Sequence, residues 1–545
     1  MPGSDGSWTD AREILDVLFE CDTLEKAADL LYRVRITSGI EVSSFISGVH
    51  VSVTYRSQRD PPETTVDSFE PKTGRLLAKV TCSREETVRD AVEAAKAAFP
   101  AWSKTTRAQR SQHLQRVAQL IQEHAELFAV WESIDQGKTI ERARVEVERA
   151  VANFSYFSTY ILHEQTTSRM VDGVAITYEH RSPAGLFALI SPWNMPLYLL
   201  TWKIAPCLAF GCTAVAKPSE ATSMTAFLLT RIFELAHLPP GVINIIFGDG
   251  QTGDALVRAK GINGISFTGS TSTGVAIRRA TVENISKKLS LELGGKNPTV
   301  VFADAMSSAY RVRSISIAAM AAFENAGQIC LCGSRIYVEK SVYADFLRQF
   351  VKHVTKRYTL RKRVGAVASR EHYNKIRGYL QMAADQGATF ELGGVPPELA
   401  HSAAELMGNN EAADDDDNDP LADGYWIAPT ILTNVKEDSD LQRHEIFGPV
   451  VTVTPFSGGE DEAIRLANDS DYGLAAVLLT ADGARTQRVG EQLDAGLVWV
   501  NSWLVRELGT PFGGMKQSGI GREGGDYSRD TFTNVRTIHL PLLYA

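Results

Sequence analysis

Short apolar runs alternate with helix-length stretches between residues 187 and 295, and this rhythm limits the fold more than any other feature. The runs lie in "GLFALISPWN", "CTAVAKPSE", "GVINIIFGDG", "INGISFTGS" and "KKLSLELGG". Each is short, apolar and bounded by Gly or Pro, which favours a buried strand over a helix. Buried strands that alternate with helices are typical of parallel sheets. The pattern therefore predicts a doubly wound α/β unit.

The flanking sequence indicates further parts of the chain, as its 545 residues lead us to expect. Apolar residues recur every three or four positions from about 80 to 162, which predicts helices. A second α/β stretch runs from "SRIYVEKSV" to "AGLVWVNSW" and predicts a separate domain. Residues 403–424 are acidic and poor in apolar side chains, so we expect an exposed loop, with a cation site as the alternative. An amphipathic stretch within residues 1–42 is interpreted as a structural addition, with a partner-binding helix as the alternative.

Composition argues against several classes of protein. The formal net charge is −9 and the chain has no long Lys/Arg run, so we expect no nucleic-acid partner. No apolar stretch approaches the roughly 18 uninterrupted residues that cross a bilayer, so we expect no membrane span. Six cysteines are scattered along the chain, and its first residues resemble neither a secretory signal nor a transit peptide. These features favour the cytoplasm.

Two groups of residues indicate a site for phosphate and ribose. In "ISFTGSTSTG", Gly269, Ser270 and Gly274 stand where a strand turns into a helix, and the N–H groups of a helix N-terminus attract anions. The spacing differs from G-x-G-x-x-G, so a plain strand–helix turn is the alternative. In "AVAKPSE", Lys217 and Glu220 end a strand. An acidic residue there can hold the adenosine ribose and repel the 2′-phosphate of NADP; the alternative is a solvated surface pair.

A carboxylate and a thiol are the candidates for catalysis. "LELGG" places Glu292 at the end of an apolar strand, where burial prepares a general base unless a backbone N–H holds the carboxylate. "FENAGQICLCGSR" places Cys330 and Cys332 just after Gly327, which would end the preceding helix. No further Cys pair or His cluster is present, so we expect no metal site, and a redox pair would normally be C-x-x-C. A nucleophile or a packing pair remains, and a turn with free N–H groups would lower the pKa of the Cys330 thiol.

Seven motifs occur in order along the chain: "SPWNMP", "AKPSE", "FTGSTSTG", "LELGGK", "FENAGQIC", "EIFGPV" and "PFGGMKQSGIGREGG". Together they resemble the NAD(P)-dependent aldehyde dehydrogenase superfamily, over about residues 45 to 540. The resemblance implies an α/β fold with a Rossmann-like coenzyme domain, an α/β catalytic domain and a small β oligomerisation arm. The arm would pair the hairpin near "MVDGVAITYEHRSP" with "TNVRTIHL", in a homodimer or homotetramer. The implied boundaries are an N-terminal extension at 1–42, a coenzyme-binding domain at 43–163 and 183–292, a catalytic domain at 293–500 with its acidic insertion at 403–424, and an arm at 164–182 and 527–545.

The resemblance also assigns roles to single residues. It makes Cys330 the nucleophile and Glu292 the general base, and it forms the oxyanion hole from Asn194 and the Cys330 backbone N–H. Cys332 would have no essential role. The expected reaction is NAD-dependent oxidation of an aldehyde to a carboxylic acid through a Cys330 thioester. The implied NAD-binding residues are Ser191, Trp193, Lys217, Glu220, Gly250, Gly269, Ser270, Gly274, Glu445 and Phe447.

Two arginines bear on the substrate. Arg506 in "VNSWLVRELGTPFGG" would lie on the loop that lines the aldehyde entrance, where a guanidinium suits a substrate carboxylate. Arg149 in "EVERAVANFSYF" is a second candidate anchor, and the alternative for both is a surface or salt-bridge role. The stretch is similar to a subgroup of the family whose substrate, 2-aminomuconate 6-semialdehyde of tryptophan degradation, carries a carboxylate. The alternatives are 2-hydroxymuconate semialdehyde, betaine aldehyde and a broad range of aliphatic aldehydes.

The chain also departs from the family pattern. Glu292 and Cys330 stand 330 − 292 = 38 positions apart, roughly four more than the family pattern implies, and the extra length lies in "DAMSSAYRVRS". The usual Gly-Asp-Pro loop is shortened before "VGAVAS". The longer interval between Glu292 and Cys330 is the best support for an alternative of another class, a non-catalytic descendant that uses the fold for structure or binding.

Overall fold

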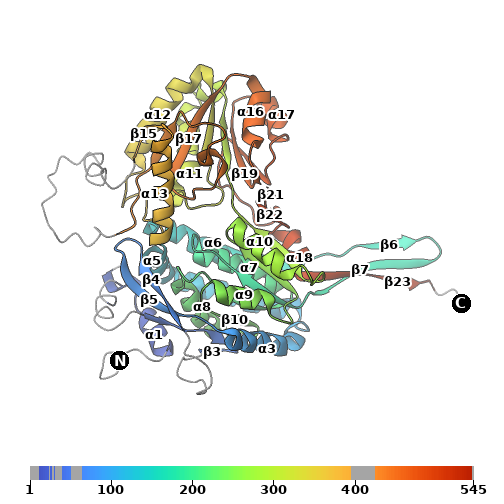
Figure 1. Cartoon of the computed structure of the whole chain (residues 1–545). Helices are drawn as coiled ribbons and strands as arrows, with labels where there is room; N and C mark the ends of the chain where they lie inside the picture. The colour runs from blue at the N-terminus through green and yellow to red at the C-terminus, as the bar shows by residue number, and fades with distance from the viewer. Residues whose placement is uncertain are drawn as a thin grey trace.

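The computed structural model describes residues 11–50, apart from 24, 28, 29 and 31–39, together with 64–394 and 424–542. Figure 1 shows two lobes, each with helices packed around a sheet, and a long β arm that extends to one side. The acidic insertion predicted at 403–424 lies outside the described residues, apart from Gly424. Within the described ranges, no helix is long and apolar enough to cross a membrane.

The lower lobe in Figure 1 contains an eight-stranded sheet with the order β22-β12-β11-β8-β9-β10-β2-β3. Its five central strands are parallel, and short antiparallel strands extend both edges. The doubly wound α/β prediction is therefore confirmed. The strands are β2 (Phe45–Ile46), β3 (Val49–His50), β8 (Leu186–Ile190), β9 (Thr213–Lys217), β10 (Ile243–Ile245), β11 (Gly264–Thr268), β12 (Lys288–Glu292) and β22 (Gly519–Ile520).

Helices cover both faces of this sheet, because successive side chains of a strand point to opposite faces. Leu186 and Ala188 of β8 belong to the cluster under α3, α9 and α10, whereas Phe187 and Leu189 belong to the cluster with α4, α7 and α8. Hydrophobic residues on both faces explain why these strands are continuous apolar runs. The helices of this lobe are α3 (Glu85–Trp102), α4 (Arg107–Glu123), α5 (Ala125–Gln136), α6 (Ile140–His163), α7 (Pro196–Ala209), α8 (Met224–Leu235), α9 (Gly250–Arg258) and α10 (Thr271–Thr281).

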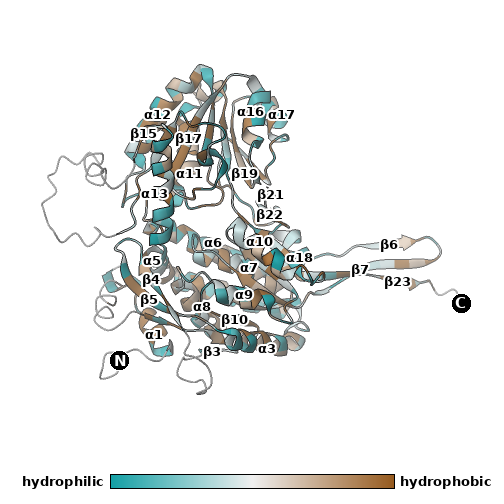
Figure 2. Cartoon of the chain, viewed as in Figure 1, coloured by the Kyte–Doolittle hydropathy of each residue, from teal (hydrophilic) through white to brown (hydrophobic). Residues whose placement is uncertain are grey.

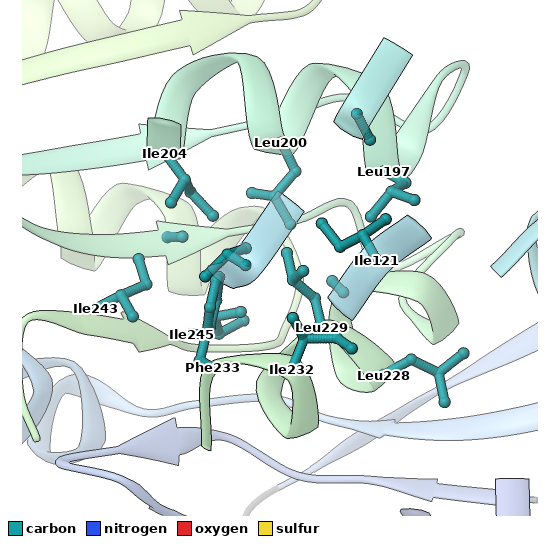
Figure 3. Packing of buried hydrophobic residues seen from close by; sticks show 14 of the residues in the cluster. Ile121, Leu197, Leu200, Ile204, Leu228, Leu229, Ile232, Phe233, Ile243 and Ile245 are labelled. Carbon is teal, nitrogen blue, oxygen red and sulfur yellow. The ribbon is translucent and has the colours of Figure 1, made fainter. Parts of the chain in front are cut away.

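The largest hydrophobic core lies on the α7–α8 face. In Figure 3, side chains of both helices and of α4 close over the strand β10. Burial of one such side chain contributes about 1.5–3 kcal/mol, so this face is a major source of the stability of the lobe. The residues labelled there are Ile121, Leu197, Leu200, Ile204, Leu228, Leu229, Ile232, Phe233, Ile243 and Ile245.

The upper lobe contains a seven-stranded sheet with the order β15-β16-β17-β14-β13-β19-β20. All neighbours are parallel except the edge strand β15. Its strands are brown in Figure 2, as expected for a sheet that helices cover. Its elements are β13 (Pro298–Val301), η2 (Ala303–Met306), α11 (Arg311–Phe323), η3 (Glu324–Gly327), β14 (Arg335–Glu339), η4 (Lys340–Val342), α12 (Tyr343–Arg357), α13 (Arg370–Asp385), β15 (Thr389–Leu392), β16 (Thr430–Thr433), α15 (Asp440–Arg443), β17 (Val450–Phe456), α16 (Gly459–Asn468), β19 (Ala475–Leu479), α17 (Gly483–Gly490) and β20 (Leu497–Val500).

The arm is a three-stranded antiparallel sheet with the order β23-β7-β6. β23 (Thr533–Pro541) pairs along its whole length with β7 (Ala175–Pro183), which also pairs with β6 (Ser168–Val171). The pairing of the hairpin with the last strand, which the sequence resemblance implies, is therefore confirmed. Several apolar side chains of the arm are exposed, namely Met170, Val171, Val174, Ile176, Val535 and Leu540.

The N-terminal helix α1 (Ala11–Leu18) packs on the lower lobe rather than standing free. Ile14, Leu15 and Leu18 are buried in the main core, and Asp16 pairs with Arg231 of α8 at 3.2 Å. This is the behaviour expected of a structural addition. The remaining elements are β1 (Ile40–Val42), β4 (Thr65–Glu70), β5 (Arg75–Thr81), β18 (Tyr472–Gly473), β21 (Met515–Lys516) and α18 (Gly525–Phe532).

Candidate active site

The order of the strands in the first sheet predicts where a ligand binds. β8 is followed by β9 and β10 on one side and then by β11 and β12 on the other, so the chain reverses direction between β8 and β11. In doubly wound sheets, ligands bind at the carboxyl ends of the strands next to such a reversal. Asn194, Lys217, Gly269 and Glu292 all lie at or just after the carboxyl ends of strands of this sheet.

The second sheet contributes residues from the opposite ends of its strands. Asn297, Cys330 and Phe447 each precede a strand, β13, β14 and β17 respectively. Hydrogen bonds join these loops to the first sheet: the Asn194 side chain donates to the Gln328 carbonyl at 2.9 Å, and the Gly295 N–H donates to Glu445 Oε1 at 2.8 Å. The site therefore lies where the two sheets meet.

A strained turn presents Cys330. The helix α11 ends at Phe323, and Asn325, Ala326 and Gly327 then adopt positive φ angles of 52°, 54° and 72°. Such angles are uncommon for residues with a Cβ and cost on the order of 1 kcal/mol each. A Cβ on Gly327 would lie 2.1 Å from the carbonyl oxygen of Gly448, so glycine is required there. Tertiary contacts therefore hold the turn in a conformation that the isolated sequence disfavours.

Asn297 fixes the backbone of the cysteine turn. Its Nδ2 donates to the carbonyl oxygens of Cys330 at 2.7 Å and Cys332 at 2.9 Å, and its Oδ1 accepts from the Ala475 N–H at 3.0 Å. The side chain is buried, so these bonds do not compete with water. Our sequence reasoning missed this residue, and the only signal was a polar side chain directly before a buried strand.

Cys330 is half-buried as a residue and is not in a disulfide. Burial raises its pKa, and the nearby carboxylates of Glu445 and Glu292 raise it further. The sequence prediction of a lowered pKa is therefore wrong, because desolvation is the largest influence on the thiol and, among the described residues, only Arg506 opposes it. A raised pKa means that a base has to remove the thiol proton before the sulfur can attack. Cys332 is buried, and burial raises its pKa to about 12.

Glu292 is a buried carboxylate without a hydrogen-bond partner. It is 3% exposed, and neither oxygen has a donor among the described residues. Burial raises its pKa well above the usual value, and Glu523 adds to the rise, while Lys203, Arg522 and Arg506 oppose it. The backbone partner proposed as the alternative to a general base is therefore not seen. A carboxyl group that water does not stabilise is poised to take up a proton.

A buried ionic network lies behind Glu292. Lys203 Nζ donates to Glu523 Oε1 and to Ser266 Oγ, both at 3.0 Å, and Trp202 Nε1 donates to Glu523 Oε2 at 2.6 Å. Sequence reasoning missed this network, because its members come from α7, β11 and the loop before α18. Burial is the main cause of the raised pKa of Glu292; within this network Glu523 adds to the rise and Lys203 opposes it.

The side-chain amide of Asn194 contacts the turn that carries Cys330, at Gln328, two residues before the cysteine. Its Nδ2 donates to the Gln328 carbonyl, and its own backbone carbonyl accepts from Asn325 Nδ2 at 3.2 Å and from Lys138 Nζ at 3.3 Å. Since one Nδ2 hydrogen makes the bond to Gln328, the other remains a donor for a developing oxyanion. The structure thus brings Asn194 and the Cys330 turn together.

The predicted ribose and phosphate residues lie at the carboxyl ends of β9 and β11. Lys217 is buried and its Nζ contacts Glu220 Oε2 at 3.4 Å. Ser270 caps the helix α10, accepting from the Thr273 N–H at 3.1 Å. A Cβ at Gly269 or Gly274 would lie 2.4 Å from the Phe267 ring or 2.6 Å from Leu293 respectively. The two glycines are therefore explained by packing, whether or not a phosphate binds beside them.

Two other predicted coenzyme residues, Gly250 and Ser191, differ in how well their surroundings fit an anion. Gly250 begins α9, where the Asp249 carboxylate already accepts from the N–H groups of Gln251 and Thr252. A phosphate would be repelled by that carboxylate, so Gly250 is a poor phosphate contact. Ser191 follows β8 and its buried Oγ has no partner among the described residues, so it is available to a ligand.

Aromatic rings pack together next to Glu445, whose carboxylate helps to raise the pKa of Cys330. The rings of Trp193 and Phe447 meet edge-on with centroids 5.3 Å apart, and His372 packs on Trp193 at 4.8 Å. His372 Nε2 bonds the Phe447 carbonyl at 2.7 Å, and burial lowers its pKa to about 4, so the imidazole is neutral. Lys375 Nζ donates to the backbone carbonyl of Glu445 at 3.1 Å. Our sequence reasoning identified neither His372 nor Lys375.

The two predicted substrate arginines converge on one aromatic ring. The guanidinium of Arg149 lies 5.5 Å from the centroid of the Tyr198 ring, and that of Arg506 lies 5.7 Å from it. Arg506 also donates to the Tyr198 hydroxyl and packs against Trp202 and Phe512, at 4.1 and 4.4 Å. Its Nη2 is buried and has no partner among the described residues. The structure therefore presents an unused donor in an aromatic pocket.

The model of the aldehyde dehydrogenase family matches residues 57–538 of the chain. The chain belongs to this family. Aldehyde dehydrogenases catalyse the NAD-dependent oxidation of aldehydes, so the predicted enzyme class is confirmed. Within the parts of the chain that the structure describes, no cluster of side chains suits a metal ion.

Individual aldehyde dehydrogenases give a finer comparison. The chain is 46% identical to the 2-aminomuconic semialdehyde dehydrogenase of Danio rerio, over 88% of this chain and 95% of that protein. It is 37% identical to the 2-hydroxymuconic semialdehyde dehydrogenase of a Pseudomonas strain, over 92% of this chain and all of that protein. The betaine aldehyde dehydrogenase of Staphylococcus aureus, solved in complex with NAD+, superimposes with a TM-score of 0.82 at 33% identity, covering 93% of this chain and 96% of that one.

Proposed function

We propose that this enzyme oxidises 2-aminomuconate 6-semialdehyde, an aldehyde that carries a carboxylate, in the degradation of tryptophan by the kynurenine route. The observation that carries the proposal is the placement of Arg149 and Arg506 on the ring of Tyr198. Neither arginine forms an ion pair within the described part of the chain, and burial disfavours the charge of Arg149. Two cations that repel each other favour an anion between them, which a substrate carboxylate supplies. The names of the relatives from Danio rerio and Pseudomonas support the same substrate class.

The residues at the strand ends fit NAD. We infer that Lys217 and Glu220 hold the adenosine ribose and that the Glu220 carboxylate disfavours the 2′-phosphate of NADP. Ser270, Gly269 and Gly274 would approach the phosphates, with Ser191 Oγ as a further donor. Gly250 would leave open space beside the adenosine, because a Cβ at this position would have no other atom within 4 Å. Glu445, Phe447 and Trp193 would contact the nicotinamide half.

The residues of the chain carry the remaining chemistry. Because burial raises the pKa of Cys330, Glu292 or water first removes the thiol proton, and the sulfur then adds to the aldehyde carbon. The developing oxyanion accepts hydrogen bonds from Asn194 Nδ2 and the Cys330 N–H. NAD supplies a hydride acceptor, after which the acyl group remains on Cys330 as a thioester. Glu292 passes any proton taken from the thiol to solvent and then removes a proton from water. The hydroxide adds to the thioester carbonyl, which releases the carboxylic acid and the Cys330 thiolate.

The charges of the same two arginines also predict how well each alternative substrate would bind. 2-Hydroxymuconate semialdehyde carries the same carboxylate, so Arg149 and Arg506 suit it equally. Betaine aldehyde carries a quaternary ammonium group, which two guanidinium groups repel. Neutral aliphatic aldehydes would bind without the contribution of the arginines.

Steady-state kinetics with four aldehydes test the proposal. The panel contains 2-aminomuconate semialdehyde generated in situ, 2-hydroxymuconate semialdehyde, hexanal and betaine aldehyde. We expect the two carboxylated substrates to have the highest kcat/KM. We expect Arg506→Ala to lower their kcat/KM by about 10- to 200-fold and to leave hexanal nearly unchanged. An equal loss for all four substrates would disprove the carboxylate anchor.

We also infer an assembly and a location. The exposed apolar side chains of the arm favour pairing with another copy of the chain, as a homodimer or homotetramer. The proposal includes the domain boundaries inferred from the sequence, in which residues 164–182 and 527–545 form the arm. The distribution of cysteines supports the cytoplasm.

A further inference from the structure

The extra length between Glu292 and Cys330 forms an ordered turn at the start of α11. Ser314 is buried, and its Oγ donates to the Ala305 carbonyl at 2.9 Å. Arg311 Nε donates to the Met306 carbonyl at 3.1 Å, which closes the turn between η2 and α11. Val312 is 78% exposed, so this segment packs only partly against the lobe. The turn is tied down by its own hydrogen bonds and has no catalytic residue, which leaves its role open.

One side chain of this segment reaches the loop that carries Arg506. Arg313 Nη2 donates to the backbone carbonyl of Asn501 at 3.0 Å. Asn501 has a positive φ of 49°, and its side chain bonds Thr480 twice, accepting from its N–H at 3.1 Å and donating to its carbonyl at 2.7 Å. The Asn501 carbonyl is therefore held in a fixed direction, toward Arg313.

The loop from 501 to 506 leads from this contact directly to the substrate arginine. Trp499 Nε1 donates to the Val505 carbonyl at 2.8 Å, and Trp503 Nε1 donates to the carbonyl of Leu331, next to Cys330, at 3.1 Å. Leu504 adopts a positive φ of 61°. The loop thus contains two strained residues, and strain of this kind persists only where contacts hold it.

We propose that Arg313 is a positioning residue that holds loop 501–506, so that Arg506 meets the substrate carboxylate. The inference rests on the proposed carboxylated substrate. Arg313 does not touch the reacting atoms; it acts through the Asn501 carbonyl. Loss of the contact lets the loop relax, which weakens binding of the carboxylate and leaves the Cys330 chemistry intact.

The test compares Arg313→Ala, Arg313→Lys and Val312→Ala in the full-length protein. Val312→Ala is the matched control, because it shortens an exposed neighbouring side chain that makes no hydrogen bond to the loop. We expect Arg313→Ala to raise KM for 2-aminomuconate semialdehyde about three- to tenfold, as loss of one hydrogen bond allows, with kcat and both constants for hexanal unchanged. Arg313→Lys should restore part of the loss, and Val312→Ala should have no effect.

Parallel assays of Arg506→Ala separate the two proposals. If Arg506→Ala selectively weakens the carboxylated substrate and Arg313→Ala does not, the positioning role is wrong and the proposed function stands. If Arg313→Ala weakens both substrates equally, or Val312→Ala has the same effect as Arg313→Ala, the positioning role is also wrong. If Arg506→Ala shows no selectivity, the proposed function fails, and the inference fails with it.

Discussion

The side chain of Asn297 holds the catalytic turn through the carbonyl oxygen of Cys330, with a 2.7 Å hydrogen bond. The same amide nitrogen bonds the Cys332 carbonyl at 2.9 Å, so one buried residue fixes the backbone on both sides of Leu331. The geometry of the thiol therefore depends on a residue that is not part of the chemistry.

Replacement of Asn297 tests this dependence. Asn297→Asp keeps the shape of the side chain but removes the Nδ2 donor, and leaves two buried carbonyls unpaired at a cost of about 1–3 kcal/mol each. We expect kcat to fall at least tenfold, because the turn no longer holds Cys330 in place. Alkylation of Cys330 by iodoacetamide should change rate in the same variant. Unchanged kcat and alkylation rates would show that the turn does not need Asn297.

The raised pKa of Glu292 leads us to expect that the stability of the folded protein depends on pH. Its pKa is raised in the folded protein, so above the unfolded value of about 4.3 the folded state binds more protons than the unfolded state. Stability therefore falls as pH rises from that value toward the folded pKa. Glu292→Gln cannot titrate, so its Tm relative to wild type should increase between pH 5 and about 8. A Tm difference that is independent of pH would contradict the assignment.

The lowered pKa of Lys296 leads us to expect the opposite dependence of stability on pH. The amine is buried without a partner among the described residues, and burial lowers its pKa to about 7, with Arg335 adding to the effect. Between that value and about 10.4 the unfolded state binds more protons, so stability from this residue rises with pH. Lys296→Met should therefore stabilise the protein most at pH 6 and progressively less toward pH 10. Chemical denaturation at several pH values measures this, and a gain that grows with pH would refute it.

We expect the positive charge of Arg149 to contribute to the selectivity for carboxylated aldehydes. Arg149→Met keeps the apolar stem near Tyr198 but removes the cation, so we expect KM for carboxylated aldehydes to rise about tenfold or more, and hexanal to be unaffected. The double variant with Arg506→Met should show less than the product of the single effects, because both arginines share one ring. Independent, multiplicative effects would place the two arginines in separate sites.

We expect Glu220 to determine the preference of the enzyme for NAD over NADP. The carboxylate contacts Lys217 at the end of β9, where it would meet the 2′-position of the adenosine ribose. We expect Glu220→Gln to raise kcat/KM for NADP at least tenfold relative to that for NAD. Steady-state assays with both coenzymes measure the ratio, and an unchanged ratio would remove Glu220 from the coenzyme site.

The sequence predicted the parts of the structure that depend on local pattern. The strands that end at Lys217, Thr268 and Glu292 were visible as short apolar runs, because both faces of the sheet are covered by helices. Glu292 stood out as a carboxylate at the end of an apolar strand, and it is indeed buried. The resemblance to the family then brought Cys330 and Asn194 into the same site.

The properties that depend on long-range contacts were not predictable. The raised pKa of Cys330 arises from burial and from Glu445, which is 115 positions later in the chain (445 − 330). The network of Lys203 and Glu523 joins residues 320 positions apart, and no short motif contains both. The contact between Arg313 and Asn501 likewise forms only when the upper lobe is folded, because the two residues are 188 positions apart in the chain.

The most direct measurement is the appearance of NADH with 2-aminomuconate semialdehyde, compared between wild type, Cys330→Ala and Cys332→Ala. The account predicts turnover in wild type and in Cys332→Ala, and none in Cys330→Ala, because only Cys330 forms the thioester. Turnover that survives in Cys330→Ala, or that is lost only in Cys332→Ala, would contradict the assignment of the nucleophile. No turnover by wild type, in a preparation that oxidises hexanal, would contradict the substrate.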